Sequence, residues 1–357
     1  MLRSPAFPRQ PLLCGYYGEH NLGDDALLQA LLAQLPLGCD PCITAADQAL
    51  VHQRFGVRSC DRRSLKAVLQ ALAQSDGLVF GGGSLLQDST SLRSLLYYGA
   101  LITAARLQRK PVLLWGQGLG PLRRRRSRAL VRLLLPLVSA ASWRDAASAE
   151  LACALGRPRQ PADGWGCDPV WSLEPQHWRG LNGPIVLCWR PTALLHSHQW
   201  ELLLKALDEV AASSAREVLW LPFHQGQDVE LFSQLCERGL VPQRLQARSR
   251  QLQATTPEQA MAVFSGAGLV LAMRLHALIL GALSGAPVAA LSYDPKVAAA
   301  AAALPCEQLE LAALPDQASV ISCAWQACLD QPLPAARIAA QRHSALVHQQ
   351  LLNPQHS

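Results

Sequence analysis

Cationic side chains follow two apolar runs in the last third of the chain. The run at residues 269–272 stops just before Arg274 and His276, and a second run ends in S-Y-D-P-K, whose last residue is Lys296. We interpret this stretch as strand, turn, helix, strand and turn. In open α/β sheets, ligands bind outside the carboxyl ends of the strands, and both turns fall at such ends. Because a helix N-terminus also favours an anion, the simplest ligand here is a phosphate or a carboxylate.

The spacing of Arg274 and His276 favours a turn over a continuous helix. Residues two apart on a helix point to nearly opposite sides, so these side chains can share a ligand at a strand end but not on a helix. The alternative is structural: Arg274 pairs with a nearby carboxylate, and His276 caps the helix or packs at its start. The spacing alone leaves both interpretations open.

A second loop with chemically useful residues lies near the N-terminus. Residues 12–14 predict a buried strand, the following stretch to residue 25 reads G-Y-Y-G-E-H-N-L-G-D-D, and residues 26–35 predict a helix. Asp24 or Asp25 is placed to cap that helix. The alternative is that one carboxylate faces a cleft as an acid, a base or an acceptor for a sugar hydroxyl. The sequence matches neither the P-loop pattern nor G-x-G-x-x-G.

Glycine-rich stretches follow two further predicted strands. Residues 78–80 are followed by G-G-G-S, and residues 111–115 by G-Q-G-L-G-P. Glycine permits a tight turn or a close approach of the backbone to a ligand. Because the carboxyl ends of parallel strands share one edge of a sheet, we expect the three loops to line one cleft.

The elements that would position these residues alternate between strand and helix in both halves of the chain. In the second half, predicted strands at residues 185–189 and 218–221 lead to Arg190 and His224. Such alternation predicts an α/β fold with two doubly wound, Rossmann-like domains. Each domain would bring its strand-end loops to one edge of its sheet.

We place the domain boundary where the periodic pattern lapses, between residues 171 and 184. The predicted domains are residues 1–175 and residues 176–330. Residues 331–357 predict an amphipathic helix, for which packing on the N-terminal domain is one option.

The composition narrows the class of protein. The 357 residues are half apolar and only 6% aromatic, which suits helices packed on sheets and two domains. Eleven scattered cysteines, without a charged and apolar leader, predict a reducing cytoplasm. Cys39 and Cys42 have no second ligand pair at zinc-site spacing, so we predict neither a metal site nor a cofactor. The longest apolar run, residues 277–292, is too short to span a membrane.

The positive charge comes from arginine. The chain has a formal net charge of +6, with 28 Arg against 4 Lys, and a run of arginines lies at residues 123–128. Arginine suits carboxylate and phosphate ligands, and GC-rich coding would produce the same bias. The run is most simply a solvated helix face. The alternatives are an anionic membrane surface and a docking patch for an acidic substrate. Nucleic acid is disfavoured because no aromatic residues are interleaved.

With these motifs collected, the sequence resembles the polysaccharide pyruvyl transferase family, in particular bacterial members that pyruvylate a cell-wall sugar for surface-layer anchoring. The motifs occur in family order between about residues 12 and 300. They are G-Y-Y-G-x-x-N-L-G-D-D at 15–25, G-G-G-S-L-L-Q-D at 81–88, G-Q-G-L-G-P at 116–121, P-F-H…D at 222–228, and M-R-L-H-A-L with S-Y-D-P-K-V at 273–297.

The resemblance implies a GT-B-like fold in which two domains face a cleft. It also implies transfer of pyruvate from phosphoenolpyruvate to two hydroxyls of a glycan sugar as a cyclic ketal, with release of phosphate. Phosphoenolpyruvate carries a phosphate and a carboxylate, and it therefore needs several fixed cations and N–H groups. Its C3 must gain a proton, so a general acid must reach the vinyl carbon.

The resemblance assigns roles to individual residues. Arg190 and Arg274 would clamp the donor, and His276 would be the general acid, a role that its near-neutral intrinsic pKa permits. Asp24 would be the base or a carboxylate that binds the acceptor, with Asp25 as the alternative. The remaining substrate-binding residues would be Asn21, Gly82, His224, Leu275 through its backbone, and Lys296.

Two other classes of protein remain open from the sequence. A GT-B glycosyltransferase that uses a nucleotide sugar would share the architecture and the phosphate-binding half. A non-catalytic protein that binds anionic glycans or a partner enzyme is the second. For a transferase, the partners would be phosphoenolpyruvate and a glycan acceptor, with or without a lipid carrier. The location would be the cytoplasm, with peripheral contact with the inner membrane surface as an option.

Overall fold

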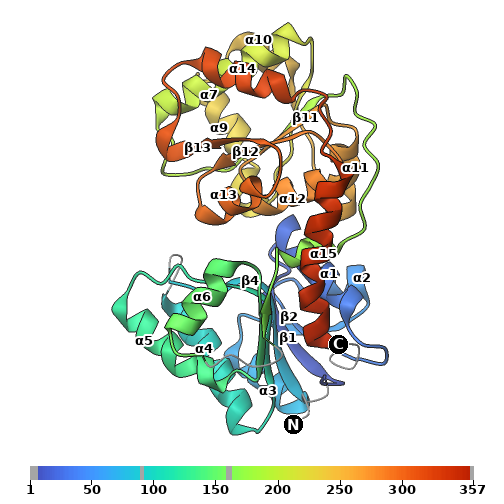
Figure 1. Cartoon of the computed structure of the whole chain (residues 1–357), viewed down its shortest axis with the longest axis vertical. Coiled ribbons are helices and arrows are strands. Elements are labelled where there is room, and N and C mark those ends of the chain that lie inside the picture. Colours follow the sequence, from blue (N-terminus) through green and yellow to red (C-terminus); the bar gives the residue numbers. More distant parts are fainter. Residues whose placement is uncertain (1–6, 89–91, 158–162, 354–357) are drawn as a thin grey trace. The chain divides into compact units, whose positions relative to one another are not determined.

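The computed structural model describes residues 7–88, 92–157 and 163–353 (Figure 1). The chain divides into two compact units, and neither unit is one continuous piece of chain. The first unit consists of Met1–Glu19, Asp24–Ser172 and Arg342–Ser357. The second unit consists of His20–Gly23 and Leu173–Gln341. The first loop thus contributes four residues to the second unit. The last part of the chain, from Arg342, returns to the first unit.

Within the described residues, the first unit is built on a seven-stranded parallel sheet. The strand order is β3-β2-β1-β4-β5-β6-β7. This order is that of a doubly wound sheet, in which the chain runs outward in one direction from β1 and then in the other from β4. The strands are β1 (Pro11–Tyr17), β2 (Cys42–Ala45), β3 (Arg58–Asp61), β4 (Gly77–Leu86), β5 (Val112–Leu119), β6 (Ala140–Trp143) and β7 (Gly164–Trp165).

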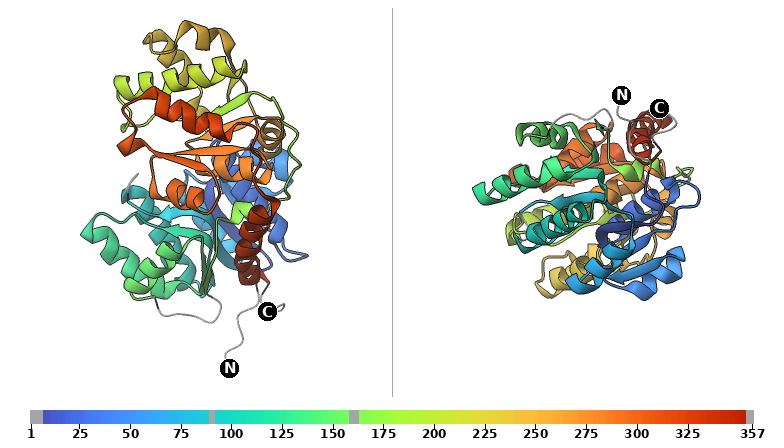
Figure 2. Two further views of the ribbon diagram at one scale, coloured as in Figure 1. Left: turned by 45° about the horizontal axis from the view of Figure 1, so that its top comes forward. Right: turned by 90° about the horizontal axis from the view of Figure 1, so that it is seen from below.

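Helices cover both faces of this sheet (Figure 2). Strand β5 is buried along its whole length, which explains why the central strands read as continuous apolar runs rather than as alternating ones. Leu12 and Phe80 pack with apolar residues of α3, α4 and α5 on one face. The helices are α1 (Leu22–Gln34), α2 (Gln48–Phe55), α3 (Leu65–Gln74), α4 (Leu92–Leu107), α5 (Arg125–Leu134) and α6 (Ala146–Ala154).

The glycine-rich stretches lie within strands rather than in loops. We expected a loop to begin at Gly81, and this expectation is wrong, because β4 continues beyond the three glycines. A Cβ on Gly81 would lie 2.1 Å from the Tyr17 hydroxyl, which donates a hydrogen bond to the Gly81 carbonyl at 2.6 Å. Gly82 has a φ of 76° and faces Leu27 of α1. The glycines thus permit close packing of protein on protein. Strand β5 likewise includes most of the second glycine-rich stretch.

In the described part of the chain, the second unit contains a six-stranded parallel sheet with the order β10-β9-β8-β11-β12-β13. Together the two parallel sheets with flanking helices confirm the predicted α/β class. The strands are β8 (Ile185–Cys188), β9 (Val218–Trp220), β10 (Ser249–Gln251), β11 (Leu269–Ala272), β12 (Val288–Ser292) and β13 (Glu307–Glu310). The helices are α7 (Ser197–Ser213), α8 (Gln225–Asp228), α9 (Leu231–Glu237), α10 (Gln243–Arg248), α11 (Pro257–Ser265), α12 (Leu275–Leu283), α13 (Pro295–Ala302) and α14 (Ala318–Cys328).

A tryptophan cluster fills one side of the second sheet. The Trp189 ring lies 5.6 Å from Trp220, 6.0 Å from Trp200 and 6.3 Å from Trp325, measured between centroids. All four side chains are buried. Large aromatic side chains dominate the burial of apolar surface in a core, so this cluster holds β8 and β9 against α7 and α14. Arg190 follows directly after Trp189, the central tryptophan. The packing of Trp189 therefore fixes the backbone from which the Arg190 side chain extends.

The last helix, α15 (Ala335–Leu352), passes from the second unit into the first at residue 342. In the first unit, His348 is fully buried, with Nδ1 2.9 Å from Ser142 Oγ and Nε2 2.7 Å from the Cys167 carbonyl oxygen. The amide of Cys167 donates to Ser344 Oγ at 3.1 Å. For the predicted amphipathic helix we expected Ile338, Ala345, Leu346 and Leu352 on the apolar side. Leu346 is 44% exposed, so the expectation is wrong for this residue, whereas the other three are buried.

Among the described residues, none of the helices has the length and apolar character that crossing a bilayer requires.

Candidate functional site

Two neighbouring strands of the second sheet, β8 and β11, end level with one another, and the third, β12, continues two residues further. Ala272 of β11 pairs with Cys188 of β8 and with Ala290 of β12. Arg190 and Arg274 each lie two residues beyond this level. Because adjacent strands are ~4.8 Å apart, the register brings both arginines to the same height at the carboxyl edge, where open α/β sheets bind ligands.

Arg274 is held by a buried carboxylate from α8. Its Nε donates to Asp228 Oδ2 at 3.0 Å, its Nη2 donates to Asp228 Oδ1, and Nη2 also lies 3.0 Å from Gln227 Oε1. The Asp228 side chain is fully buried, and that of Arg274 is 12% exposed. The structural alternative, an ion pair with a nearby carboxylate, is therefore correct for Arg274. Such a fixed pair also orients the guanidinium group for a second, external anion.

Asp228 is a residue of the candidate site that we did not predict from the sequence. Besides Arg274, its Oδ2 accepts from the backbone amides of Phe223 at 3.2 Å and His224 at 2.9 Å. Four donors thus surround one buried carboxylate, which offsets the cost of removing its charge from water. The only available signal was its position at the end of the P-F-H…D motif.

Arg190 turns toward the loop after β12. Its Nη1 lies 3.1 Å from the Tyr293 hydroxyl, and its Cζ lies 4.9 Å from the centre of the Tyr293 ring. In the strand order, β11 stands between β8 and β12, and β8 stands between β9 and β11. Arg190 therefore reaches across the end of β11, while Arg274 reaches across the end of β8. Both side chains therefore run along the carboxyl edge of the sheet between β9 and β12.

His276 lies in the first turn of α12 and packs against Gly23. A Cβ built on Gly23 would lie 2.3 Å from His276 Nδ1, closer than any real Cβ contact. The glycine of the N-L-G-D-D motif is therefore required by the imidazole of the M-R-L-H-A-L motif. Both residues belong to the second unit.

The segment His20–Gly23 is bound to the second unit through its backbone. The Leu22 amide donates to the Phe223 carbonyl at 2.9 Å, the Gln225 amide donates to the His20 carbonyl at 3.0 Å, and Asn21 forms an antiparallel bridge with His224. These bonds place two predicted substrate-binding residues, Asn21 and His224, side by side. His224 is only 9% exposed.

Asn21 also caps α1, a role that we predicted for an aspartate. Its Oδ1 accepts from the Gly23 amide at 3.0 Å, as an N-cap side chain does. Helix α1 begins at Leu22, so Asp24 and Asp25 lie inside its first turn, and the prediction that one of them is the cap is wrong. Asp25 instead pairs with Arg54 at 2.7 Å.

Two helix N-termini add backbone donors to the same sheet edge. Helix α12 begins at Leu275 and its N-cap residue, Arg274, provides no side-chain hydrogen bond. The Leu275 amide, at the first position of the helix, has no acceptor within the helix and can donate to an external anion. Helix α13 is capped by Asp294, whose Oδ2 lies 3.8 Å from Lys296 Nζ. The Lys296 side chain is 35% exposed and can reach a ligand.

The remaining predicted residues, Asp24 and Gly82, belong to the first unit. Burial raises the pKa of Tyr17 well above its usual value, and the nearby Asp24 carboxylate adds to this effect. The Gly82 carbonyl accepts from Gln117 Nε2 at 2.6 Å. Its packing explains the glycine, and acceptor binding at Gly82 stays a prediction.

Arg144 follows directly after β6 and belongs to none of the predicted site residues. This side chain is 9% exposed, its Nη2 donates to Ser84 Oγ at 2.7 Å, and Asp168 lies 3.8 Å away. A Cβ on Gly118 would lie within 2.7 Å of Ser84 and Arg144. The first unit thus also has a cation at the carboxyl edge of its sheet.

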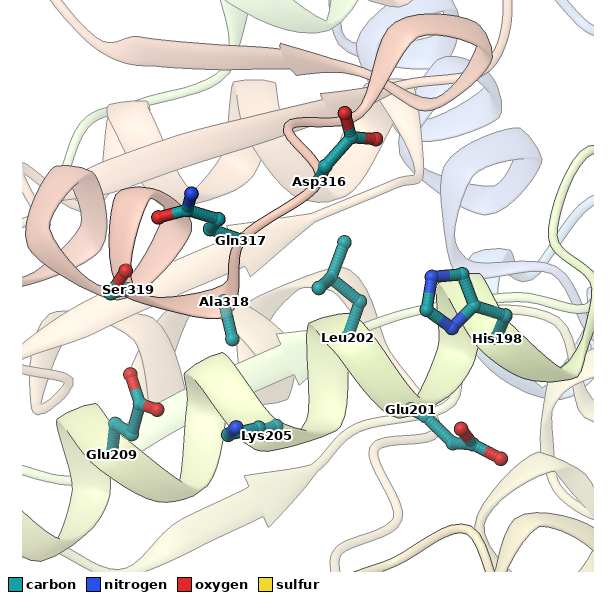
Figure 3. A pocket seen from close by; sticks show the side chains of 9 residues that line it. All are labelled: His198, Glu201, Leu202, Lys205, Glu209, Asp316, Gln317, Ala318 and Ser319. Carbon is teal, nitrogen blue, oxygen red and sulfur yellow. The ribbon is translucent and has the colours of Figure 1, made fainter.

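A hollow elsewhere in the second unit does not fit an anionic ligand. It has a volume of about 460 Å³ and lies between α7 and the start of α14 (Figure 3). Three of its side chains, Glu201, Glu209 and Asp316, are carboxylates, against one lysine and one histidine. No group of three or more histidine, cysteine or carboxylate side chains suited to a metal ion occurs in residues 7–88, 92–157 and 163–353.

Similarity to known proteins identifies the family to which this chain belongs. The family model described as polysaccharide pyruvyl transferase matches residues 21–295. The chain belongs to the polysaccharide pyruvyl transferase family. This confirms the resemblance seen in the motifs, and the protein is a transferase. The match begins at Asn21 and ends at Pro295, so it includes the arginines and His276 of the second sheet edge.

Solved structures with the same fold are distant in sequence from this pyruvyl transferase family member. A putative UDP-N-acetylglucosamine 2-epimerase from Listeria monocytogenes has a TM-score of 0.61 at 13% identity, covering 96% of this chain and 95% of that chain. Anabaena Alr3699/HepE in complex with UDP-glucose scores 0.55 at 14%, covering 96% and 94%. MurG from Acinetobacter baumannii scores 0.54 at 14%, covering 97% and 99%. These likenesses establish the two-domain α/β fold of GT-B enzymes and epimerases. No curated protein matches the sequence.

Proposed function

We propose that the enzyme transfers pyruvate from phosphoenolpyruvate to two hydroxyls of one glycan sugar as a cyclic ketal. The observation that carries this proposal is the edge of the second sheet, where Arg190, Arg274 and Lys296 lie beside the uncapped start of α12. A ligand with both a phosphate and a carboxylate matches several cations and N–H groups at one place. The family match supports the same chemistry.

In this proposal, Arg190 and Arg274 bind the two anionic groups of the donor. Arg274 is positioned by Asp228, and Arg190 by its contact with Tyr293. The backbone of Leu275 and the ammonium group of Lys296 complete the binding set. Fixed donors of this kind need no reorganisation when charge develops in the transition state.

His276 is the proposed general acid. Its imidazole gives a proton to C3 of phosphoenolpyruvate, and C2 becomes an electrophile that one sugar hydroxyl attacks. Phosphate then leaves, and the second hydroxyl closes the ketal at C2. The two sugar hydroxyls release two protons. One proton returns to His276 and replaces the proton that C3 received, and the other leaves with the phosphate. The contact with Gly23 sets the orientation of the ring, which general acid catalysis requires.

Asp24 is the proposed base or acceptor-binding carboxylate, and Asn21, Gly82 and His224 complete the acceptor side. Asp24 directly follows the segment that contacts His276 and lies in the first turn of α1. Asp25 is a poorer choice because it is only 3% exposed and pairs with Arg54. The acceptor is a sugar of a polysaccharide, free or carried on a lipid.

The experiment that tests the function follows the leaving group. The protein is incubated with phosphoenolpyruvate and a panel of glycan acceptors, and free phosphate and the acid-labile ketal are measured. The alternative is transfer from a nucleotide sugar, which the fold shared with the UDP-glucose complex favours. Release of nucleoside diphosphate from nucleotide sugars, without phosphate release from phosphoenolpyruvate, would establish that alternative.

A further inference from the structure

The positive charge of the protein is concentrated in one stretch. Between Asp88 and Asp145 the sequence has eleven basic residues and no acidic one. The rest of the chain has 21 basic and 26 acidic residues, a formal net charge of −5, whereas the whole chain carries +6. A coding bias would spread arginine along the chain, so this segregation has a local cause.

Most of these cations lie on α5 and at its start. The buried side of α5 consists of Ser127, Val131 and Leu134, which recur at i, i+4 and i+7. Arg125, Arg126, Arg128 and Arg132 are exposed, and Arg123 and Arg124 precede the helix and are also exposed. Asp88 lies under this end of the helix, where its carboxylate accepts from the amides of Arg123 at 2.9 Å and Arg124 at 2.8 Å.

Among the described residues, the guanidinium groups on the outer face of α5 differ from several other arginines in their ion pairing. Within the part of the chain that the structure describes, Arg125, Arg126 and Arg132 form no ion pair. By contrast, Arg62 and Arg63 both pair with Glu19. A solvated helix face normally mixes charges of both signs, whereas this face keeps one sign and creates a positive field.

Exposed leucines lie on the same two helices. Helices α4 and α5 are neighbours on one side of the first unit (Figures 1 and 2), and a Cβ on Gly99 of α4 would lie 3.0 Å from the Leu134 side chain of α5. Leu96 and Leu107 on α4 are 53% and 81% exposed, and Leu133 on α5 is 72% exposed. Leu96 and Leu107 are eleven positions apart, three helical turns, so they share one stripe of α4. Apolar side chains beside arginines are typical of helices that lie in a membrane interface.

We propose that the outer face of α4 and α5 binds the surface of an anionic phospholipid bilayer. The arginines contact the headgroups, and Leu96, Leu107 and Leu133 insert at the boundary with the acyl chains. A soluble acidic polymer would match the charge but would leave the leucines exposed to water, so the lipid surface fits both features. The inference uses none of the residues proposed for catalysis and stands independently of that function.

Binding of the full chain to vesicles tests this inference. Sedimentation with phosphatidylcholine vesicles is compared with sedimentation with equimolar phosphatidylcholine and phosphatidylglycerol. We expect binding only to the anionic vesicles, weakened by salt. The triple variant Arg125→Gln, Arg126→Gln, Arg132→Gln should bind about 100-fold more weakly, because each basic residue near such a surface contributes ~1 kcal/mol.

Two further variants make the test specific. Arg238→Gln, Arg250→Gln, Arg337→Gln removes the same charge from exposed positions elsewhere and should bind like the parent. Leu107→Ser, Leu133→Ser keeps every charge and should bind more weakly by at least about tenfold, because two inserted apolar side chains are lost. Equal loss in the two arginine triples overturns the proposal. Unchanged vesicle binding by the leucine variant, with tight binding of the parent to dextran sulfate, would show a general polyanion site instead.

Discussion

At the scale of single residues, a buried carboxylate determines where Arg274 points. The Asp228 carboxylate accepts hydrogen bonds from two backbone amides and from Nε and Nη2 of Arg274. Removing one partner of such a buried pair leaves the other charge without compensation. The geometry of the proposed donor site therefore depends on a residue that need not touch the donor.

We predict that Asp228→Asn raises the KM for phosphoenolpyruvate by about tenfold or more, because Arg274 loses a charged partner and its fixed orientation. Steady-state kinetics with varied donor checks this. Asp208→Asn is the matched control. Asp208 lies on α7, and its two carboxylate oxygens accept from Nε and Nη2 of Arg244 at 3.1 and 2.7 Å. An equal rise in KM in both variants would assign Asp228 to general stability only.

We predict that His276→Ala lowers kcat by about 10²–10⁴-fold, the usual contribution of a general acid. The variant should still fold and bind phosphoenolpyruvate, because the cations are retained. Turnover and calorimetric donor binding are measured in parallel. Parent-like turnover would remove His276 from the proton transfer.

A third substitution tests the contact that orients the imidazole. Gly23→Ala should lower kcat about 10- to 100-fold, because the added methyl group would lie 2.3 Å from His276 Nδ1 and would force the ring to move. Gly266→Ala is the control in the same unit, where the nearest atom to the new methyl group would be 3.7 Å away. If the two variants have the same kcat, the ring does not depend on Gly23.

The site residues differ in how far the sequence could reveal them. Arg190 and Arg274 were recognisable because each follows an apolar run that ends a strand. Asp228 was not, because its partner lies 46 positions away and nothing local marks the pair. The requirement for glycine at position 23 could not be predicted either, because only the fold brings His276 into contact with this residue.

At the scale of elements, Asp88 replaces a missing helix cap. The N-cap residue of α5, Arg124, makes no side-chain cap, and Asp88 accepts from the amides of Arg123 and Arg124 instead. Burial raises the pKa of Asp88, but these amide hydrogen bonds, the Ser127 hydroxyl and the Arg124 charge outweigh that effect and lower it. The carboxylate thus also fixes the start of the basic helix.

Asp88→Asn should destabilise the protein by about 1 kcal/mol at neutral pH, as loss of a cap does. Because the folded pKa lies below the unfolded value of about 3.9, this stabilisation is present above that pH and is lost as the pH falls below it. Urea unfolding of parent and variant at pH 6 and pH 3 measures the difference. A difference that does not shrink on acidification would contradict the assignment.

The central strands could be predicted and the edge strands could not. Strands such as β5 and β11 are buried on both faces and read as apolar runs. The edge strands β3, β10 and β13 have the sequences R-S-C-D, S-R-Q and E-Q-L-E and are partly exposed, so no hydrophobic pattern marks them. The glycines of β4 were misread because the same residue serves turns and close packing.

At the scale of the whole molecule, His348 ties the end of the chain to the first unit. Burial lowers its pKa, although the hydrogen bond with the Cys167 carbonyl opposes this effect. The folded state therefore favours the neutral imidazole. Its neighbours Ser142 and Trp115 belong to β6 and β5, so α15 is anchored on the centre of the sheet.

The stability of the parent should fall as the pH drops below about 6.5, because the unfolded chain then binds a proton at His348 that the folded state excludes. His348→Gln keeps a hydrogen-bonding side chain without this proton and should lose less stability between pH 7.5 and pH 5.5. Urea midpoints at the two pH values measure this. Equal losses in parent and variant would exclude His348 as the source.

The return of residues 342–353 to the first unit affects how the protein is made. A ribosome releases the N-terminal sheet long before it synthesises His348 and its neighbours. Until then, Trp115 of β5 and Ser142 of β6 lack their contacts with α15. The first unit therefore completes its fold only once residues 342–353 have left the ribosome, and a chain that stalls before residue 342 exposes a surface that chaperones recognise.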